Sequence, residues 1–377
     1  MRVLIMTCNT GEGHNSCAKA IKQGFEEKGA VCDVIDSLQF ISDRFSRFFS
    51  WGHITIYRRL PGLFRHGYGY VEKHPGILDE DSVMYKVFAS GMKRFYALMQ
   101  QEKYDVVLCT HVFAGLLLNA TLREHPMNIK TGFIATDYTC YPGAASTGLQ
   151  RFFIPAAELT EAFVSSGVPR EKLHISGIPI RQEFYSRTDR AAAKAHFGLK
   201  PDRPHLVLMC GSMGCGPMEE LAKQLSKRMC KRHALTIVCG TNEKLYRTLK
   251  EKYGYLSNVH IKGFVKEMSL LMDSADLYLT KPGGLSVTEA AAKNLPMVYI
   301  DAVAGCEGHN CRFFVKNGGA VTAATVPELT ALCLSLLRDP ARREAMSAQL
   351  AALGIKNATC DIWEQLQLDV RQPEPVC

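Results

Sequence analysis

The sequence predicts an α/β protein built from two doubly wound domains that face each other across a cleft. With 377 residues, the chain is too long for one ordinary hydrophobic core and suits two domains. Short runs rich in apolar and β-branched residues alternate with segments of helical period, and this alternation occurs in both halves of the chain. Because such strands are apolar on both faces, they are typical of parallel sheets that helices cover on both sides.

Ten predicted strands define the two domains. They lie at residues 2–8, 31–37, 104–111, 130–138 and 151–155 in the first half, and at 205–213, 235–240, 259–264, 276–282 and 296–302 in the second. Predicted helices in the first half cover 16–29, 81–102, 113–124 and 158–166. A polar and charged stretch between about 183 and 204 separates the halves. We therefore predict an N-terminal domain over 1–188, a second domain over 200–345, and C-terminal helices over 346–377 that pack across the junction.

The composition excludes several classes of protein. Hydrophobic residues make up 47% and charged residues 22% of the chain, which excludes disordered, collagen-like and coiled-coil proteins. No apolar run reaches about 18 residues, and the first apolar run is too short for a signal peptide. The 14 cysteines show neither C-x-x-C nor zinc-finger spacing, so we expect reduced thiols in a cytosolic protein. The net charge of +8 is compatible with a phosphate, nucleic-acid or membrane partner.

The turns that follow predicted strands are the candidate binding sites. In open α/β sheets, ligands bind beyond the carboxyl ends of the strands, where helix N-termini present free N–H groups. Gly11, Gly13 and His14 follow the first strand; the glycines allow close backbone approach, and a neutral imidazole can act as a base near pH 7. The alternative interpretation is a glycine turn with a capping histidine.

Two further glycine turns fit a phosphate ligand. The turn from Gly211 to Gly216 precedes Pro217 and is a candidate anion-binding turn, although it matches neither a Walker A loop nor a G-x-G-x-x-G pattern; a plain βα turn is the alternative. Gly283 and Gly284 open a helix after the strand at 276–282, so their N–H groups can hold a diphosphate.

Carboxylates near these turns fit the hydroxyls of a nucleotide sugar. Glu289 lies one turn into the helix opened by Gly284, where it can accept from two ribose hydroxyls; a solvated helical glutamate is the alternative. Glu307 and Asn310 belong to the glycine-containing stretch 305–310, which suits a polyhydroxylated ligand, or else forms a surface turn with an asparagine cap.

Six segments together resemble a known family. They are GEGH at 11–14, TDY at 136–138, SGIPIR at 176–181, GSMG at 211–214, KPGGLSVTEA at 281–290 and GCEGHN at 305–310. Over about residues 1–345 they are similar to the glycosyltransferases, family 28-like, that comprise monogalactosyldiacylglycerol synthases and bacterial diacylglycerol glucosyltransferases. The resemblance implies a GT-B fold of two Rossmann-like domains, inverting transfer from a UDP-sugar, and a lipid acceptor at a membrane surface.

The resemblance also implies roles for single residues. The donor diphosphate is approached by Gly211, Ser212, Met213 and Gly214 and bound at Lys281, Gly283, Gly284 and Ser286. Phe264 and Val265 hold uracil, Glu289 binds the ribose, and Glu307 and Asn310 contact the sugar. His14 and Asp137 lie on the acceptor side, where either residue or the pair serves as the general base. Tyr141 stands where the family often has a histidine, so this chain departs from the family on the acceptor side.

Neither a cofactor nor a metal is expected. GT-B enzymes typically use helix N-termini and basic side chains to neutralise the leaving UDP, and the sequence lacks a D-x-D motif where a divalent ion would bind. The hexose can be glucose or galactose, because these differ in the orientation of one hydroxyl.

Residues 39–73 have an unusual composition. Between Arg44 and Val71 they contain five arginines, among them Arg58 and Arg59, no acidic residue and eight aromatic residues, among them Trp51. This combination fits an interfacial segment that inserts apolar rings and attracts anionic headgroups. An aromatic insertion packed on its own domain is the alternative, and nucleic-acid binding fits poorly with a nucleotide-sugar site. We expect a cytoplasmic enzyme that associates peripherally with the membrane.

The sequence thus predicts an inverting glycosyltransferase that moves a hexose from UDP-glucose or UDP-galactose to diacylglycerol or a glycosyl-diacylglycerol. Two alternatives stay open. One is a related transferase with another lipid or polyprenyl acceptor, and the other is a non-catalytic protein that binds nucleotide sugars or lipids.

Overall fold

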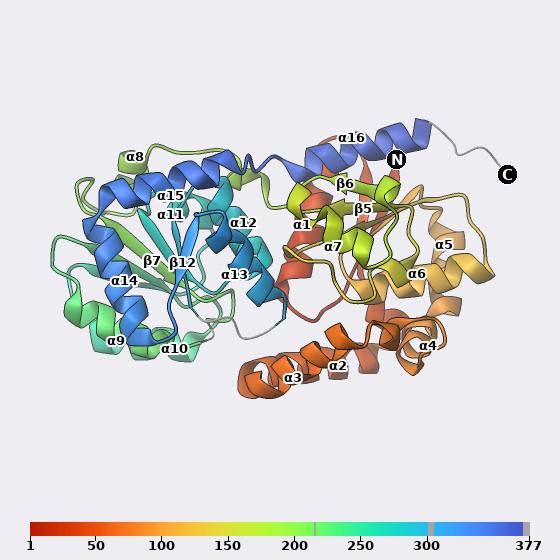
Figure 1. Cartoon of the computed structure of the whole chain (residues 1–377), viewed down its shortest axis with the longest axis horizontal. Helices are drawn as coiled ribbons and strands as arrows, with labels where there is room; N and C mark the ends of the chain where they lie inside the picture. Colours follow the sequence, from red (N-terminus) through yellow and green to blue (C-terminus); the bar gives the residue numbers. More distant parts are fainter. Residues whose placement is uncertain (215, 301–304, 372–377) are drawn as a thin grey trace. The chain divides into compact units, whose positions relative to one another are not determined.

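The computed structural model describes residues 1–214, 216–300 and 305–371, without the side chains of Ile54, Tyr57, Arg58, Arg59, Pro61, Pro75 and Arg371. The chain divides into two compact units (Figure 1). Unit 1 comprises Met1–Gln182 and, later in the chain, Gly305, Cys306 and the residues from Lys356 onward. Unit 2 begins at Glu183 and includes Glu307–Ile355.

Unit 1 contains a six-stranded parallel sheet in the order β2-β1-β3-β4-β5-β6. The strands are β1 (Arg2–Thr7), β2 (Val31–Asp36), β3 (Val106–Cys109), β4 (Lys130–Ile134), β5 (Arg151–Ile154) and β6 (Leu173–Ile175). The interior strands are buried over almost their whole length, as their continuous apolar sequences require. The strand order reverses between β1 and β3, which makes their carboxyl ends the topological switch point of this sheet.

Helices flank the sheet of unit 1. They are α1 (Glu12–Glu26), α2 (Asp43–Arg59), α3 (Pro61–Lys73), α4 (Val83–Ala89), α5 (Met92–Glu102), α6 (Val112–Glu124), α7 (Thr160–Ser165) and α16 (Ala358–Arg371). Short 3₁₀ turns lie at η1 (Ser37–Phe40), η2 (Pro75–Leu78), η3 (Ala145–Thr147), η4 (Ala157–Leu159), η5 (Arg170–Lys172) and η6 (Gln182–Phe184). The last helix, α16, packs on α1, where the Trp363 and Phe25 rings meet edge to face at 5.0 Å. An Arg151–Asp369 ion pair of 2.8 Å also holds α16 to this unit.

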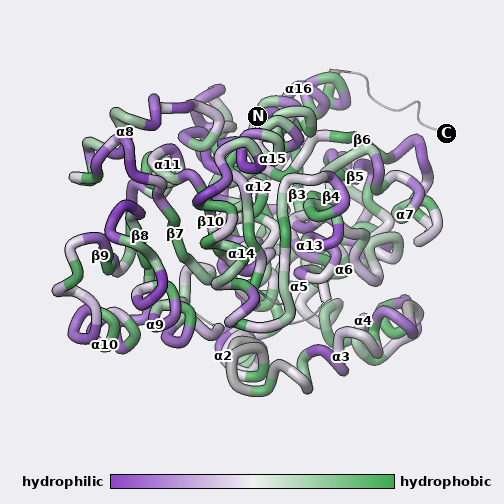
Figure 2. Tube along the Cα trace, turned by 60° about the vertical axis from the view of Figure 1, so that its left-hand side comes forward, coloured by the Kyte–Doolittle hydropathy of each residue, from purple (hydrophilic) through white to green (hydrophobic). Residues whose placement is uncertain are grey.

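Unit 2 repeats the architecture with the order β12-β11-β10-β7-β8-β9, all parallel. Its strands are β7 (His205–Met209), β8 (Ala234–Val238), β9 (Val259–Lys262), β10 (Leu277–Thr280), β11 (Met297–Tyr299) and β12 (Ala320–Thr322). Its helices are α8 (Arg190–His196), α9 (Met218–Arg228), α10 (Glu243–Tyr253), α11 (Met268–Asp273), α12 (Gly284–Ala292), α13 (Cys306–Lys316), α14 (Val326–Arg338) and α15 (Pro340–Ala352). The outer helices α9 and α10 carry hydrophilic residues beside hydrophobic ones (Figure 2). The switch point of this sheet lies between β7 and β10.

The ten predicted strands are all present, and two further strands were not predicted. These are β6 and β12, which have three residues each and lie at the edges of their sheets. Each of these strands spans only three residues, fewer than the run of about four to eight residues from which a strand is recognised. The predicted helix over 81–102 is two helices, α4 and α5, that meet at Ser90 and Gly91.

None of the helices in the described part of the chain combines the length and apolar character that crossing a bilayer requires. None of the cysteines within the described ranges is joined in a disulfide.

Candidate active site

The first group of candidate residues gathers at the switch point of unit 1. His14 lies in the first turn of α1, directly after β1, and Thr110 and His111 follow the neighbouring strand β3. Thr136, Asp137 and Tyr141 follow β4, the next strand of the sheet. Because parallel strands end at the same edge, three separate turns bring these side chains together.

His14 is held by a backbone carbonyl. Its Nδ1 lies 2.7 Å from the carbonyl oxygen of Thr110, which can only accept a hydrogen bond, so Nδ1 carries the proton in the neutral ring. The lone pair of the neutral imidazole is therefore at Nε2. Burial lowers the pKa of His14 from its ordinary value, although the nearby Asp137 carboxylate and the Thr110 carbonyl act in the opposite direction. A neutral His14 with a lone pair at Nε2 has the properties of a general base near pH 7.

The structure brings Asp137 and Tyr141 into the same cluster. The Tyr141 hydroxyl donates a hydrogen bond to Asp137 Oδ2 and lies 2.8 Å from Thr136 Oγ1. Thr136 Oγ1 lies 3.1 Å from His14 Nδ1. Burial, followed by the charge of Asp137, raises the pKa of Tyr141 well above its ordinary value, so the phenol stays protonated.

Two histidines of this cluster were not predicted from the sequence. The His111 ring packs edge-on against His14 with the centroids 4.6 Å apart, and its Nδ1 accepts a hydrogen bond from the N–H of Phe113 at the start of α6. Burial and the neighbouring rings of His14 and His53 lower the pKa of His111 well below its ordinary value. The predicted strand at 104–111 ends at His111, just after the observed β3. Residues at the carboxyl end of a strand are candidate site residues, so this position was the signal that could have identified His111.

Gly11 caps α1 without a side-chain hydrogen bond, and Gly13 lies in its first turn. The backbone of Gly11 is extended, a conformation open to any residue, and a Cβ there would meet no atom within 4 Å. The turn therefore leaves open space beside uncapped N–H groups, which suits a ligand.

The second group gathers at the switch point of unit 2. The 211–214 turn follows β7, and the turn containing Lys281 and Gly283 follows β10, which pairs directly with β7. Gly211 and Gly214 have φ values of 69° and 55°, in the left-handed region that favours glycine. The side chains of Ser212 and Met213 are half-buried.

A third turn, after β8, supports the 211–214 turn and was not predicted. The N–H of Thr241 donates to the Ser212 carbonyl at 2.8 Å, and Asn242 Nδ2 donates to the Gly214 carbonyl at 3.2 Å. A Cβ on Gly240 would lie 2.0 Å from the Ser212 oxygen, so the two turns meet only because residue 240 is glycine. The shape of the candidate phosphate turn thus depends on three neighbouring residues.

Lys281 and Glu307 form an ion pair of 2.8 Å, with 23% and 11% of their side chains exposed. Asn310 is buried and donates from Nδ2 to the Pro282 carbonyl at 2.9 Å. The start of α13 is therefore fixed to the 281–284 turn by one charged and one neutral contact. The sequence had suggested a donor-binding role for each of these residues but not their pairing.

The helix α12 begins at Gly284 after an N-cap, Gly283, that makes no side-chain capping bond. Ser286 Oγ lies 2.9 Å from the Tyr278 hydroxyl, and Glu289 is half-buried. Gly283 has no side chain with which to cap this helix, and the N–H groups of a helix N-terminus are a common site for anions. After β9, the Phe264 side chain is 67% exposed and Val265 is half-buried.

Of the residues predicted to contact acceptor or membrane, Trp51 is exposed on α2, whereas the side chains of Arg58 and Arg59 lie outside the described residues.

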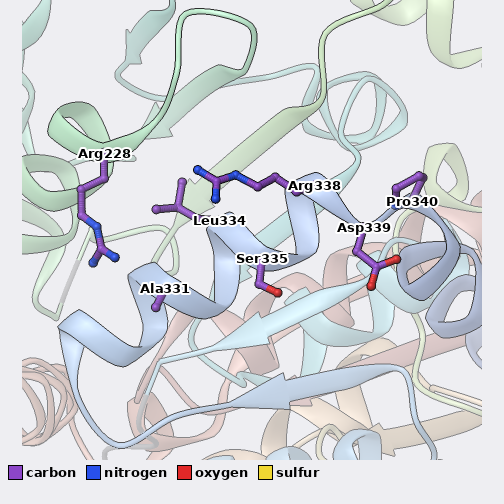
Figure 3. A pocket seen from close by; sticks show the side chains of 7 residues that line it. All are labelled: Arg228, Ala331, Leu334, Ser335, Arg338, Asp339 and Pro340. Atoms are coloured by element: carbon purple, nitrogen blue, oxygen red, sulfur yellow. The ribbon is translucent and has the colours of Figure 1, made fainter.

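A pocket of about 720 Å³ in unit 2, lined by residues of α9 and α14 and by Asp339 and Pro340, includes no predicted site residue (Figure 3). Among the residues that the structure describes, no three His, Cys, Asp or Glu side chains group as metal ligands would.

The Lys281–Glu307 pair can be tested by stability. Replacing Lys281 with methionine leaves the Glu307 carboxylate nearly buried without its cation, and we expect the free energy of unfolding to fall by about 2 kcal/mol. The matched control is Lys223→Met, which breaks an exposed Lys223–Glu220 pair and should cost under about 1 kcal/mol. Urea unfolding measures both; equal losses would show that Lys281 does not stabilise the turn.

Two family models match the chain in sequence. Residues 14–180 match monogalactosyldiacylglycerol (MGDG) synthase, and residues 205–362 match the glycosyltransferase family 28 C-terminal domain. Among curated relatives, the processive diacylglycerol beta-glucosyltransferase of Bacillus cereus (strain G9842) is 30% identical, with 92% of this chain and 89% of the relative covered. The enzyme of the same name from Staphylococcus saprophyticus is 27% identical, with 97% and 92% covered.

Solved structures show the same fold at low identity. The crystal structure of Acinetobacter baumannii MurG aligns with a TM-score of 0.63 at 15% identity, covering 98% of this chain and 99% of that one. The S. aureus MnaA–UDP structure aligns with a TM-score of 0.62 at 13% identity, covering 100% of both chains. The predicted GT-B fold and the predicted family resemblance are both confirmed. The chain therefore belongs to the family of glycosyltransferases that contains the monogalactosyldiacylglycerol synthases and the bacterial processive diacylglycerol beta-glucosyltransferases.

Proposed function

We propose that this enzyme transfers a hexose, with inversion, from a UDP-sugar to diacylglycerol or a glycosyl-diacylglycerol at a membrane surface. One observation carries the proposal: a neutral histidine and two glycine turns lie at the switch points of the sheets in a chain whose relatives are named for this reaction. The relatives' name favours glucose as the hexose and more than one round of transfer.

On the donor side, the 211–214 turn and the start of α12 would hold the diphosphate of UDP. Lys281 would add a positive charge, Ser286 a hydroxyl and Glu289 two acceptor oxygens for the ribose. Uracil would lie at Phe264 and Val265, and the sugar at Glu307 and Asn310. The position of the α12 N-terminus directly after β10 and the contact between Lys281 and Glu307 support this assignment.

On the acceptor side, we assign the general base to His14. Nε2 takes the proton of the acceptor hydroxyl while its oxygen attacks the anomeric carbon, and the bond from that carbon to the diphosphate breaks. Attack opposite the leaving group inverts the configuration and gives a β-glycoside from an α-linked donor. UDP leaves with the electron pair, and the positive helix end and Lys281 stabilise its charge without a resident metal.

A donor and acceptor screen tests the proposal. Release of UDP is measured with UDP-glucose and UDP-galactose, with and without diacylglycerol in vesicles and in the presence of EDTA, and the lipid product is identified by mass. We expect release that depends on diacylglycerol and UDP-glucose and gives a glucosyl-diacylglycerol. Turnover only with a polyprenyl phosphate, or UDP-sugar binding without turnover, would overturn it in favour of the two alternatives.

Helices α2 and α3 support the membrane part of the proposal. They follow each other along the chain and are drawn in orange in Figure 1. Phe45 and Phe49 pack against the core of unit 1, whereas Phe48 and Trp51 are 71% and 64% exposed. Leu60, Leu63 and Tyr70 continue the exposed apolar surface, and Arg44 and Arg47 are also exposed. Outward apolar rings beside arginines fit insertion among anionic headgroups.

We expect the double variant Phe48→Ala, Trp51→Ala to lose most of its binding to vesicles that contain anionic lipid. Both side chains leave water only if the segment inserts, so their removal should weaken binding by at least tenfold. Vesicle flotation measures the change, and Tyr255→Ala, which removes a 79% exposed ring from unit 2, is the matched control. Equal flotation of the two variants would contradict the assignment of this surface.

A further inference from the structure

A row of hydrogen bonds joins the Asp137 carboxylate to the His14 ring through two hydroxyl groups. The members are His14 Nδ1, Thr136 Oγ1, Tyr141 Oη and Asp137 Oδ2, with 3.1 Å between the first two atoms and 2.8 Å between the next two. The last link is the hydrogen bond that Tyr141 donates to Asp137. Thr136 is 2% exposed, so water competes little for this row.

The chemistry of the end groups sets the direction of every bond. Nδ1 carries the single ring proton, because the Thr110 carbonyl, 2.7 Å away, can only accept; this N–H is shared between that carbonyl and Thr136 Oγ1 at 3.1 Å, so Thr136 accepts the longer branch of a three-centre hydrogen bond. Asp137, at the other end, accepts from Tyr141. Since Tyr141 donates its one proton to Asp137, its oxygen accepts from Thr136. All three donors therefore point from the imidazole toward the carboxylate.

We propose that Thr136 and Tyr141 are positioning residues that connect Asp137 to the base His14 in place of a direct carboxylate–imidazole contact. The proposal rests on the proposed function for the role of His14. When Nε2 takes the acceptor proton, the ring becomes positively charged, and the aligned hydroxyl dipoles and the carboxylate stabilise that charge. No proton moves along the row; it holds the ring, its tautomer and its charge. Tyr141, predicted to contact the acceptor, is thereby assigned to the support of the base.

Within the described ranges, the Asp137 carboxylate acts on both His14 and Tyr141, whereas the carboxylate of Glu72 acts on Tyr68 and Cys306, outside the row. The remaining titratable groups described nearby are His53 and His111, whose pKa values burial lowers, and Cys17, Tyr68 and Cys306, whose pKa values burial raises. Near pH 7 the histidines are therefore neutral, and so are the thiols and the phenol. Removing a hydroxyl of the row should therefore weaken the stabilisation that the Asp137 carboxylate gives to a positively charged His14 ring.

The test removes one hydroxyl at a time. In Tyr141→Phe and in Thr136→Val we expect kcat to fall about tenfold and KM for the UDP-sugar to stay within twofold. The acid limb of the kcat profile should move to lower pH, because an imidazolium with less support from Asp137 loses its proton more readily. The double variant should be no worse than either single variant, since each one already interrupts the row.

The control is Tyr104→Phe, which removes another tyrosine hydroxyl that donates to a carboxylate, Asp33, at 2.8 Å in the same unit. It should leave the acid limb unchanged. An additive double variant, or a Tyr141→Phe profile that coincides with that of Tyr104→Phe, would overturn the proposal.

A second readout does not need activity. In protein labelled with ¹⁵N-histidine, the ring of His14, assigned by its loss in a His14→Gln variant, should titrate at lower pH in Tyr141→Phe than in wild type or Tyr104→Phe. An unchanged titration of His14 in Tyr141→Phe would overturn the proposal that the row stabilises the charged ring. If wild type shows no lipid-dependent turnover but the His14 titration moves, the proposed function fails and the row stands.

Discussion

Replacing His14 with alanine is expected to lower kcat by about 10²–10⁴-fold, the range for loss of a well-placed general base. The lone pair at Nε2 is the feature that is lost, and the adjacent His111 cannot replace it. His111 uses Nδ1 to accept from a backbone N–H, so its protonated Nε2 is a donor. Steady-state release of UDP with saturating lipid measures the effect.

A second substitution at the same position separates catalysis from folding. The side-chain amide of His14→Asn can still donate to the Thr110 carbonyl near the position of Nδ1, but it cannot take a proton. We expect His14→Asn to unfold at the same urea concentration as wild type and to be as slow as His14→Ala. Recovery of turnover in His14→Asn would show that the ring only holds the turn.

The lowered pKa of His14 predicts how the activity of the wild-type enzyme depends on pH. Burial lowers the pKa of His14, so the neutral form persists below the ordinary histidine value of 6.5. As the pH falls, activity should therefore be lost only below about 6.5. An acid limb above that value would mean that another group, or a charged His14, limits turnover.

The parts of the site that were predictable are those that follow directly from one strand. The predicted strands at 2–8 and 205–213 placed His14 and Gly211 at carboxyl ends, because a buried parallel strand and the glycine turn after it are both local patterns. The switch points then follow from topology, since β1 and β7 each begin a sheet whose order reverses beside them.

What the sequence could not predict depends on pairs of turns. The pairing of Lys281 with Glu307 spans 26 positions and a strand, and the hydroxyl row spans 122 positions between His14 and Thr136. Tyr141 shows the consequence: from sequence it was a departure from the family pattern on the acceptor side, but in the structure it contacts Asp137. No local periodicity encodes which hydroxyl of one turn faces which ring of another.

The glycine at position 240 should be as indispensable to donor binding as any residue of the donor motifs, although no motif includes it. In Gly240→Ala, the new Cβ would lie 2.0 Å from the Ser212 oxygen, so the 211–214 turn has to move. We expect the free energy of unfolding to fall by about 3 kcal/mol, from left-handed strain at φ 60° together with overpacking. We also expect the Kd for UDP to rise at least tenfold, because a displaced turn no longer presents its N–H groups to the diphosphate.

The matched control for this variant is Gly198→Ala. Gly198 has a similar φ of 70° and also lies in unit 2, but a Cβ at this position would meet no atom within 4 Å, so its substitution carries the backbone strain without the collision. It should cost about 1 kcal/mol and leave UDP binding unchanged. Urea unfolding and calorimetric titration with UDP separate the strain from the collision. Unaltered UDP affinity in a folded Gly240→Ala would place the diphosphate elsewhere than the 211–214 turn, whereas a selective loss in that variant alone would tie donor binding to a contact between the turns after β7 and β8.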